Sequence, residues 1–213
     1  MISIEQGKYS IKFDEKEHKY FVNNIEVPSV TTVMKNGGLD IYGHIDQEIL
    51  KKASQRGTDV HKITELHDAG TIDIKKVNPI YMPFLNNWVT FEKSNNIEIL
   101  SSELILYSPK YNFIGTIDRV AEISVDTKEI PKGVYILDIK TGALKAIARV
   151  QLAAYKMLYE EVFGVTGTKR IVCHLTKDFA KHEVYNDEID KYMFLSCLQL
   201  YNFRKTHGLL GKK

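Results

Sequence analysis

Two charged side chains interrupt an apolar stretch in the middle of the sequence. The segment YILDIKTG (135–142) is typical of a buried strand, and side chains alternate in direction along a strand, so Asp138 and Lys140 point to one face. Burying a carboxylate and an ammonium costs on the order of several kcal/mol unless they are paired, hydrated or bound to a metal. The two residues therefore indicate either a site that uses their charge or a solvated ion pair on an edge strand.

A second carboxylate occurs in a similar setting, because Asp118 lies among apolar neighbours in FIGTIDRV (113–120). If the two strands pair, Asp118 and Asp138 approach each other, and one of them would take up a proton unless a cation joined them. A hard divalent ion with oxygen ligands, Mg²⁺ or Mn²⁺, resolves this repulsion. Lys140 would then lie beside the ion, where it can hold a water or a phosphate oxygen. The residues alone leave both the metal site and the surface ion pair open.

Five short elements, taken in order, resemble the RecB-like branch of the PD-(D/E)xK nuclease superfamily. That branch combines a G-x-x-D strand, a D/E-x-K strand often followed by Thr-Gly, and a Q-x-x-x-Y helix. It also has a histidine on an upstream helix and frequently a glutamate on the strand before the G-x-x-D motif. The matching residues in this chain are Gly115 to Asp118, Asp138 to Lys140, Gln151 to Tyr155, His61 and Glu103. The resemblance spans roughly His61 to Tyr159, about half of the chain.

The N-terminal stretch HKYFVNNIEVPSVTTV (18–33) is similar to the opening of phage-type exonucleases and of the mitochondrial genome maintenance exonuclease. It favours an exonuclease subgroup over a restriction enzyme. CRISPR-associated and helicase–nuclease relatives often carry cysteines for an iron–sulfur cluster. This chain has two cysteines, Cys173 and Cys197, which cannot supply the four thiolates of such a cluster. We therefore expect Mg²⁺ or Mn²⁺ and no iron–sulfur cluster.

The resemblance implies a role for each residue around the expected metal. Asp118 and Asp138 would be the main ligands, with the backbone carbonyl of Ile139 as a third and a ring nitrogen of His61 completing the sphere. The metal would lower the pKa of a bound water and neutralise charge on a phosphate. Lys140 would orient the attacking water or stabilise the transition state. Taken alone, His61 would be interpreted as a buried, hydrogen-bonded histidine; within this set, ligation is favoured.

For three further residues of the resemblance, more than one explanation remains open. Gln151 and Tyr155 are four residues apart and so share a helix face, which the resemblance places beside the active site. Gln151 is a candidate catalytic residue that can contact Lys140 or DNA, and Tyr155 is a candidate DNA contact that core packing explains equally well. Glu103 would bind a second metal, hydrogen-bond a metal water, or be solvated.

Four other polar residues are candidate DNA contacts. Ser29 and Thr31 could touch phosphate, although capping of a short helix explains them as well. Arg56 precedes the histidine and Arg149 precedes Gln151, so both could bind the DNA backbone, but exposed arginines usually need no such role.

The elements that must position these residues follow from hydrophobic periodicity and turn signals. A β-hairpin region with a turn at Asn23-Asn24 opens the chain, followed by a short helix that ends at Gly37-Gly38. Helices are expected over 40–69, 79–95, 145–163 and 187–206, strands over 97–107, 113–124 and 134–139, and a hairpin-like pair over 170–176 and 181–186. This order predicts an α/β fold with a central mixed β-sheet flanked by helices, which the resemblance identifies as a restriction-endonuclease-like core, and an N-terminal β-hairpin appendage.

The length and composition of the chain fit one domain. The 213 residues are expected to form a single nuclease domain, with the appendage at 1–39, the catalytic core at 40–186 and a C-terminal helix and tail at 187–213. No apolar run approaches the roughly 20 residues that span a bilayer, and the N-terminus lacks the layout of a secretion signal. We therefore expect a cytoplasmic protein, or one in the host cytoplasm if a phage encodes it, that is not secreted and has no membrane partner. The net charge of +2 permits an acidic polymer as partner.

Together these features predict a metal-dependent DNA exonuclease that hydrolyses phosphodiester bonds in single-stranded or end-exposed DNA, in replication, recombination or repair. The expected partners are DNA and a helicase, recombinase or single-strand-binding protein. One alternative is a structure-specific or nicking endonuclease on the same core. Another is a non-catalytic DNA-binding module that acts with a helicase. The complete set of Asp118, Asp138 and Lys140 argues against that module, since binding alone needs no buried metal-binding carboxylates.

Overall fold

A computed structural model of the chain describes residues 1–39, 46–142 and 146–210. The strands are β1 (Ile2–Gln6), β2 (Tyr9–Asp14), β3 (Lys19–Val22), β4 (Ile25–Val27), β5 (Ile97–Ser108), β6 (Phe113–Ile123), β7 (Gly133–Lys140), β8 (Lys169–Leu175) and β9 (Ala180–Val184). The helices are α1 (Val30–Asn36), α2 (Gln47–Asp68), α3 (Met82–Ser94), α4 (Ile147–Phe163) and α5 (Ile189–Thr206), with short 3₁₀ turns at Ile74–Lys76 and Pro79–Tyr81. The helix starts expected at Asp40 and Lys145, and the domain boundary at 40, lie outside the described residues.

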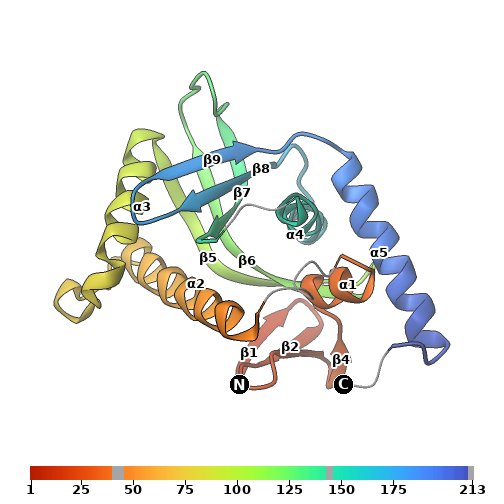
Figure 1. Cartoon of the computed structure of the whole chain (residues 1–213). Helices are drawn as coiled ribbons and strands as arrows, with labels where there is room; N and C mark the ends of the chain where they lie inside the picture. Colours follow the sequence, from red (N-terminus) through yellow and green to blue (C-terminus); the bar gives the residue numbers. More distant parts are fainter. Residues whose placement is uncertain (40–45, 143–145, 211–213) are drawn as a thin grey trace.

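The central element is a five-stranded mixed sheet in the order β5-β6-β7-β8-β9 (Figure 1). Its neighbouring strands are antiparallel except for β7 and β8, which are parallel. Parallel neighbours need a crossover connection, and α4 provides it. The fold is therefore α/β with a mixed sheet flanked by helices, as the sequence predicts.

Helices cover both faces of this sheet. On one face, α4 packs with α1 and α5 around a core that includes Ile136 and Val172. On the other face, α3 and part of α2 cover Leu137, Ile139 and Ile171 (Figure 1). Because successive side chains of β7 enter different cores, this strand is apolar on both faces, which explains its nearly continuous hydrophobic run.

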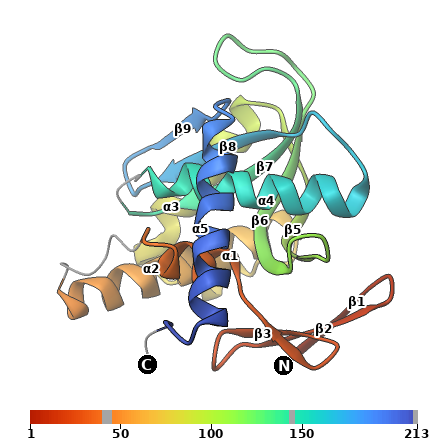
Figure 2. The ribbon, with the colours of Figure 1, turned by 90° about the vertical axis from the view of Figure 1, so that its right-hand side faces the viewer.

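The N-terminal appendage is larger than a single hairpin. Strands β1 to β4 form an antiparallel sheet of four, which lies below the central sheet in Figure 2. Asn23 and Asn24 both have left-handed backbone, with φ of 50° and 67°, as a tight hairpin turn requires. The turn is therefore where the sequence predicts it. This second sheet buries its apolar side chains against the ends of β5 and β6, in a cluster of Ile11, Tyr20, Val22, Val27, Ile105, Tyr107 and Ile114.

Helix α4 approaches the sheet closely at one glycine. A Cβ atom placed on Gly115 would lie 2.8 Å from Cε1 of Tyr155 and 3.0 Å from Leu158 Cδ1. A larger residue here would push α4 away from β6. The glycine of the G-x-x-D motif therefore has a packing reason in this fold, because it lets α4 rest directly on the strand that carries Asp118.

In the described part of the chain, no helix combines the length and the apolar character needed to cross a membrane.

Candidate metal centre and cavity

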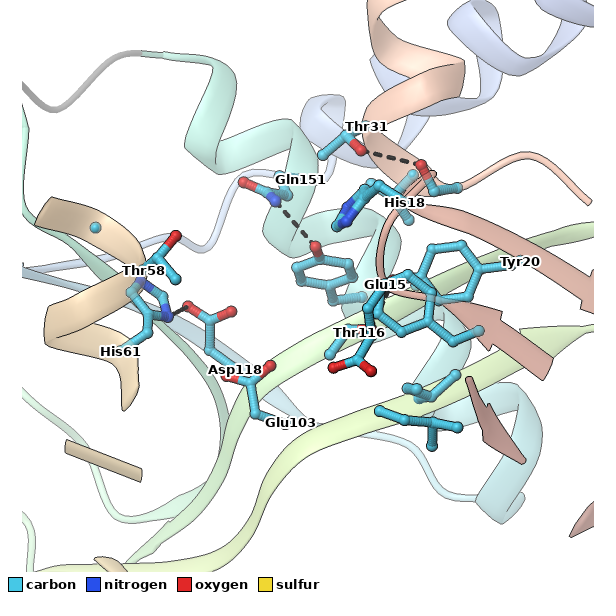
Figure 3. Close-up of a pocket in the computed structure, with 18 of the residues that line it drawn as sticks. Glu15, His18, Tyr20, Thr31, Thr58, His61, Glu103, Thr116, Asp118 and Gln151 are labelled. Atoms are coloured by element: carbon cyan, nitrogen blue, oxygen red, sulfur yellow. Dashed lines mark hydrogen bonds and ion pairs between the residues drawn. The ribbon is translucent and has the colours of Figure 1, made fainter. Parts of the chain in front are cut away.

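Three elements bring a histidine and two carboxylates together. His61 of α2, Glu103 of β5 and Asp118 of β6 each offer a ligand atom, and these atoms lie within 4.8 Å of one another. Figure 3 shows the three side chains converging, with His61 Nδ1 at 3.4 Å from Asp118 Oδ2. Residues predicted from three separate motifs thus form one cluster.

Strand β5 is irregular at the point where it supplies its ligand. The pairs Ser102–Arg119 and Leu104–Ile117 flank Glu103 and place it opposite Asp118. Glu103 has left-handed backbone, with φ of 50°. A residue other than glycine in this conformation costs about 1–3 kcal/mol, and such strain concentrates at functional sites. The sequence does not indicate this feature.

Asp138 lies next to the cluster but is turned away from solvent. The register pairs Arg119 with Leu137, so one further step places Asp118 opposite Asp138. The side chain of Asp138 is 1% exposed, against 13% for Asp118. Lys140 Nζ lies 2.7 Å from its carboxylate oxygens. The ion pair considered from the sequence is therefore present, but it lies on a central strand with its carboxylate buried, rather than on the surface of an edge strand.

The backbone of Ile139 connects the two aspartates with the histidine. Its N–H donates to Asp118 Oδ2 at 3.1 Å, and its carbonyl oxygen lies 2.8 Å from His61 Nε2. Ligands that meet an ion at right angles, each about 2.1 Å away, lie about 3 Å apart. The Ile139 carbonyl and His61 Nε2 are at hydrogen-bond distance, and two such ligands would have a similar spacing. The donor set as a whole, carboxylate and carbonyl oxygens with one imidazole, could hold a divalent cation.

The carboxylates of the site differ in their protonation. Burial raises the pKa of Asp138 to about 7 against the lowering effect of Lys140, and Asp118 raises it further. Burial and the Asp118 charge also raise the pKa of Glu103 to about 7. Burial would raise the pKa of Asp118 too, but His61, Lys140 and the Ile139 N–H outweigh it and lower that pKa. Asp118 is thus the carboxylate that stays charged at neutral pH, while the other two give up their protons readily to a cation.

The cluster opens onto a cavity of about 740 Å³ between the two sheets. His61, Glu103 and Asp118 lie on one side, and His18 and Tyr20 of the N-terminal sheet lie on the opposite side (Figure 3). The predicted residues Ser29, Thr31, Gln151 and Tyr155 also line it, whereas Asp138, Ile139 and Lys140 are outside the described lining. The N-terminal sheet therefore forms a wall of the cavity, a role the sequence does not reveal.

The polar residues of the cavity wall are hydrogen-bonded to one another. Gln151 Nε2 donates to the Tyr155 hydroxyl at 2.9 Å, and Tyr155 is otherwise buried. Ser29 caps α1, since its Oγ accepts from the Thr32 N–H at 3.1 Å, and it lies 3.0 Å from Thr31 Oγ1. Each of these residues therefore has a structural bond and also borders the cavity, while the catalytic role of Gln151 and the DNA contacts of the others stay predictions.

The two predicted arginines have partners elsewhere. Arg56 Nη2 donates to the Thr141 carbonyl at 3.3 Å, which ties α2 to the end of β7. Arg149 forms ion pairs with Asp187 and Asp190, at 3.5 and 3.3 Å, and its guanidinium lies over the ring of Tyr185. Neither arginine lines the cavity as the described residues define it.

Three residues that connect the elements of the cluster were not predicted from the sequence. The side chains of Arg119, Asp68 and Thr64 are buried, and Arg119 donates to both Asp68 and Thr64. A signal was present: Thr64 and Asp68 follow His61 by three and seven residues, so all three share a face of α2. An arginine directly after Asp118, in an otherwise apolar strand, was the matching signal on the sheet.

No family model and no curated protein matches this chain. Among solved structures, the crystal structure of SSO0001 is similar over 80% of this chain and 84% of that chain, with 13% sequence identity and a TM-score of 0.35. A TM-score this low carries no argument about this chain.

Proposed function

We propose that this chain is a metal-dependent DNA exonuclease of the RecB-like PD-(D/E)xK type, hydrolysing phosphodiester bonds in single-stranded or end-exposed DNA. The observation that carries the proposal is the meeting of His61, Glu103 and Asp118 at the cavity, beside the Asp138–Lys140 pair. We place its action in replication, recombination or repair in the cytoplasm of a cell or phage host, with a helicase, recombinase or single-strand-binding protein as partner.

The residues that would hold the metal are Asp118, His61 and the Ile139 carbonyl, with Glu103 and Asp138 beside them. A bound Mg²⁺ or Mn²⁺ supplies two effects, a lower pKa for a bound water and neutralisation of phosphate charge. Asp118 is prepared for this role, because its lowered pKa keeps it anionic at neutral pH. The orientation of His61 is fixed by two contacts, with Asp118 on one ring nitrogen and Ile139 on the other.

Lys140 supplies a positive charge next to the site. Its side chain is 32% exposed while its partner Asp138 is buried, so the ammonium lies where the buried strand end meets solvent. A phosphate oxygen carries the same kind of negative charge as the Asp138 carboxylate. Lys140 can therefore turn from Asp138 to the phosphate or hold the attacking water, which stabilises charge that develops during hydrolysis.

The dimensions of the cavity favour a single strand. A hollow of about 740 Å³ holds a few groups of one nucleotide chain. A double helix does not fit, since its two backbones lie about 12 Å apart across the major groove alone. The N-terminal sheet and α2 both border the cavity, so a strand bound there would lie between them. This geometry supports action on single strands or frayed ends.

The test is a digestion assay on single- and double-stranded linear DNA labelled at either end, with Mg²⁺ or Mn²⁺. We expect loss of the linear DNA and no attack on closed circular DNA. Nicking of closed circles would instead assign an endonuclease on the same core. Binding without cleavage in both metals would assign a non-catalytic module.

Two variants connect the activity to the proposed residues. Asp138→Ala and Lys140→Ala should each lower the rate by about a thousandfold, the upper range for loss of one charge-stabilising group. Asp126→Ala and Lys132→Ala are matched controls, because they break an exposed Asp–Lys pair in the β6–β7 connection. If the first two variants retain activity in a clean preparation while remaining folded, the site assignment is wrong.

A further inference from the structure

The side chain of Arg119 lies beneath the candidate metal centre and is fully buried. Its guanidinium contacts three elements at once: α2, β5 and β6. These are the elements that supply His61, Glu103 and Asp118. Its partners Asp68 and Thr64 lie 51 and 55 residues away along the chain, so the sequence alone does not show that they pair with it.

Toward α2, Arg119 fixes the helix at two points. Its Nε donates to Asp68 Oδ2, and its Nη2 donates to Thr64 Oγ1 at 3.1 Å. Both residues lie on the face of α2 that carries His61, one and two turns further along. The rotation of α2 about its axis, and with it the direction of the His61 ring, is thereby tied to β6.

Toward the sheet, the same guanidinium reaches the other two candidate ligands. Nη1 donates to the backbone carbonyl of Asp118 at 2.7 Å and lies 3.6 Å from Glu103 Oε1. An arginine is suited to this task because its planar fork holds several donors in fixed directions, which a lysine ammonium cannot reproduce. One rigid group thus connects the backbone of Asp118, the side chain of Glu103 and the helix of His61.

Helix α3 also bonds to Asp68, the partner of Arg119 on α2. Trp88, also fully buried, donates its indole N–H to Asp68 Oδ1 at 2.8 Å. Each carboxylate oxygen of Asp68 therefore has its own donor, and the carboxylate cannot rotate without losing one of them. Asp68 is consequently a fixed anchor for Arg119 rather than a mobile counter-charge.

We propose that Arg119 is a positioning residue, which acts through Asp68 and Thr64 to hold His61, Glu103 and Asp118 at the spacing that a divalent ion requires. The inference rests on the metal site of the proposed function. It goes further because it assigns the control of metal affinity to Arg119, a residue outside the ligand set.

The experiment uses Mn²⁺ alone, without DNA, titrated into the full chain and followed by calorimetry or by the spin resonance of the free ion. Arg119→Lys keeps a cation beside Asp68 but loses the fork. We expect Mn²⁺ affinity to fall by about 10- to 100-fold, the range found when groups that orient metal ligands are replaced.

Arg170→Lys is the matched control. Arg170 is also buried, pairs with Asp190 at 2.9 Å and donates to the backbone carbonyls of Arg149 and Asp187. It has the same kind of partners but contacts none of the three elements of the centre through its described bonds. Both variants should lower the melting temperature, whereas Mn²⁺ affinity should change by less than about twofold in Arg170→Lys.

The Mn²⁺ affinity of Arg119→Lys, compared with that of Arg170→Lys, decides whether Arg119 positions the metal ligands. A folded Arg119→Lys that binds Mn²⁺ within about twofold of the parent, or an equal loss in both arginine variants, would overturn the positioning role. If Arg119→Lys does not fold, Thr64→Val decides, since it removes the acceptor of Arg119 Nη2 together with the hydroxyl's bond to the α2 backbone. It should weaken Mn²⁺ binding by about threefold, and unchanged affinity counts against the proposal.

If the parent protein itself binds no Mn²⁺, the proposed metal-dependent function fails. The positioning role is then decided by the crystal structure of Arg119→Lys. A His61–Asp118 contact that has lengthened from 3.4 Å would support it, and an unchanged contact would overturn it.

Discussion

Helix α2 contributes residues to two clusters of almost the same composition. The two clusters differ in their access to the cavity and in the bonds that their side chains already make. The first joins His61 to Glu103 and Asp118, and the second joins His67 to Asp68 and Glu92; each offers three ligand atoms within 4.8 Å. The first opens onto the cavity. The second lies outside the described lining of that cavity, between α2 and α3.

The second cluster is already satisfied by the protein. Arg119 and Trp88 occupy the two oxygens of Asp68, and His67 Nε2 lies 3.2 Å from Glu92 Oε2. Burial and the Asp68 charge raise the pKa of Glu92 to about 8, so this carboxyl is mostly protonated at neutral pH. A metal there would have to displace Arg119 and remove a proton from Glu92.

The comparison shows that residue types and spacing do not define a metal site. What distinguishes the first cluster is access to the cavity and a charged carboxylate, Asp118, whose described side-chain bonds are to His61 and the Ile139 N–H rather than to a buried arginine. The second cluster uses similar groups to hold the first in place. A histidine with two acids is thus a candidate ligand set in one case and is already paired within the protein in the other.

The largest expected difference between the two clusters is in the rate of DNA hydrolysis. Asp118→Asn should reduce the rate on end-labelled single-stranded DNA by about a thousandfold, because it removes the charged carboxylate of the centre. Glu92→Gln should leave the rate within about twofold, since Glu92 is mostly neutral already. Equal losses in the two variants would break the distinction between the clusters.

The next test is on metal binding without DNA. His61→Ala should weaken Mn²⁺ binding by at least about tenfold, as expected for loss of a ligand, and His67→Ala should change it by less than about twofold. Calorimetric titration measures both. Weaker binding in His67→Ala alone would move the metal to the second cluster.

A smaller effect is expected in the pH dependence of stability. The pKa of Glu92 rises from 4.5 to about 8 on folding, so between these pH values the folded state holds a proton that the unfolded state has lost. This contribution to stability is therefore present at low pH and declines as the pH rises toward 8. Glu92→Gln cannot ionise and lacks the decline. The melting temperature of the parent should fall relative to this variant by a few degrees between about pH 5 and pH 9.

The exposed Glu122→Gln on β6 is the control for that measurement. It should follow the parent across the same range. If Glu92→Gln also follows the parent, Glu92 is charged in the folded protein and the second cluster is not neutralised as described.

Elements with strong local signals were predictable from the sequence. The strands expected at 113–124 and 134–139 are β6 and β7 at Phe113–Ile123 and Gly133–Lys140, because turn residues bound these apolar runs on both sides. The placement of Asp118 beside Asp138 needed only strand pairing and alternation. Gly164 ends α4 in a left-handed conformation, as expected from its position after the apolar pattern.

Features that depend on contacts between distant segments were not predictable. Strand β1 was missed, and it completes a second sheet that forms a wall of the cavity. The left-handed backbone of Glu103 arises inside a strand, at a residue that is neither glycine nor asparagine. The sequence places Arg119 directly after Asp118 and Asp68 on the His61 face of α2, but only the fold shows that their side chains are buried and paired with each other. These features are set by tertiary packing, which local patterns do not encode.

The contact between His61 and Ile139 has a consequence for how the protein folds. This contact joins residues that are 78 positions apart in the sequence. A second contact, between the Gln6 side chain and the backbone of Tyr107, joins residues that are 101 positions apart. Contacts of long sequence separation slow folding because chain entropy is lost before they form. On the ribosome, the N-terminal sheet has no apolar surface to pack against until β5 and β6 emerge. The acidic cavity is therefore assembled late, after more than half of the chain has been synthesised.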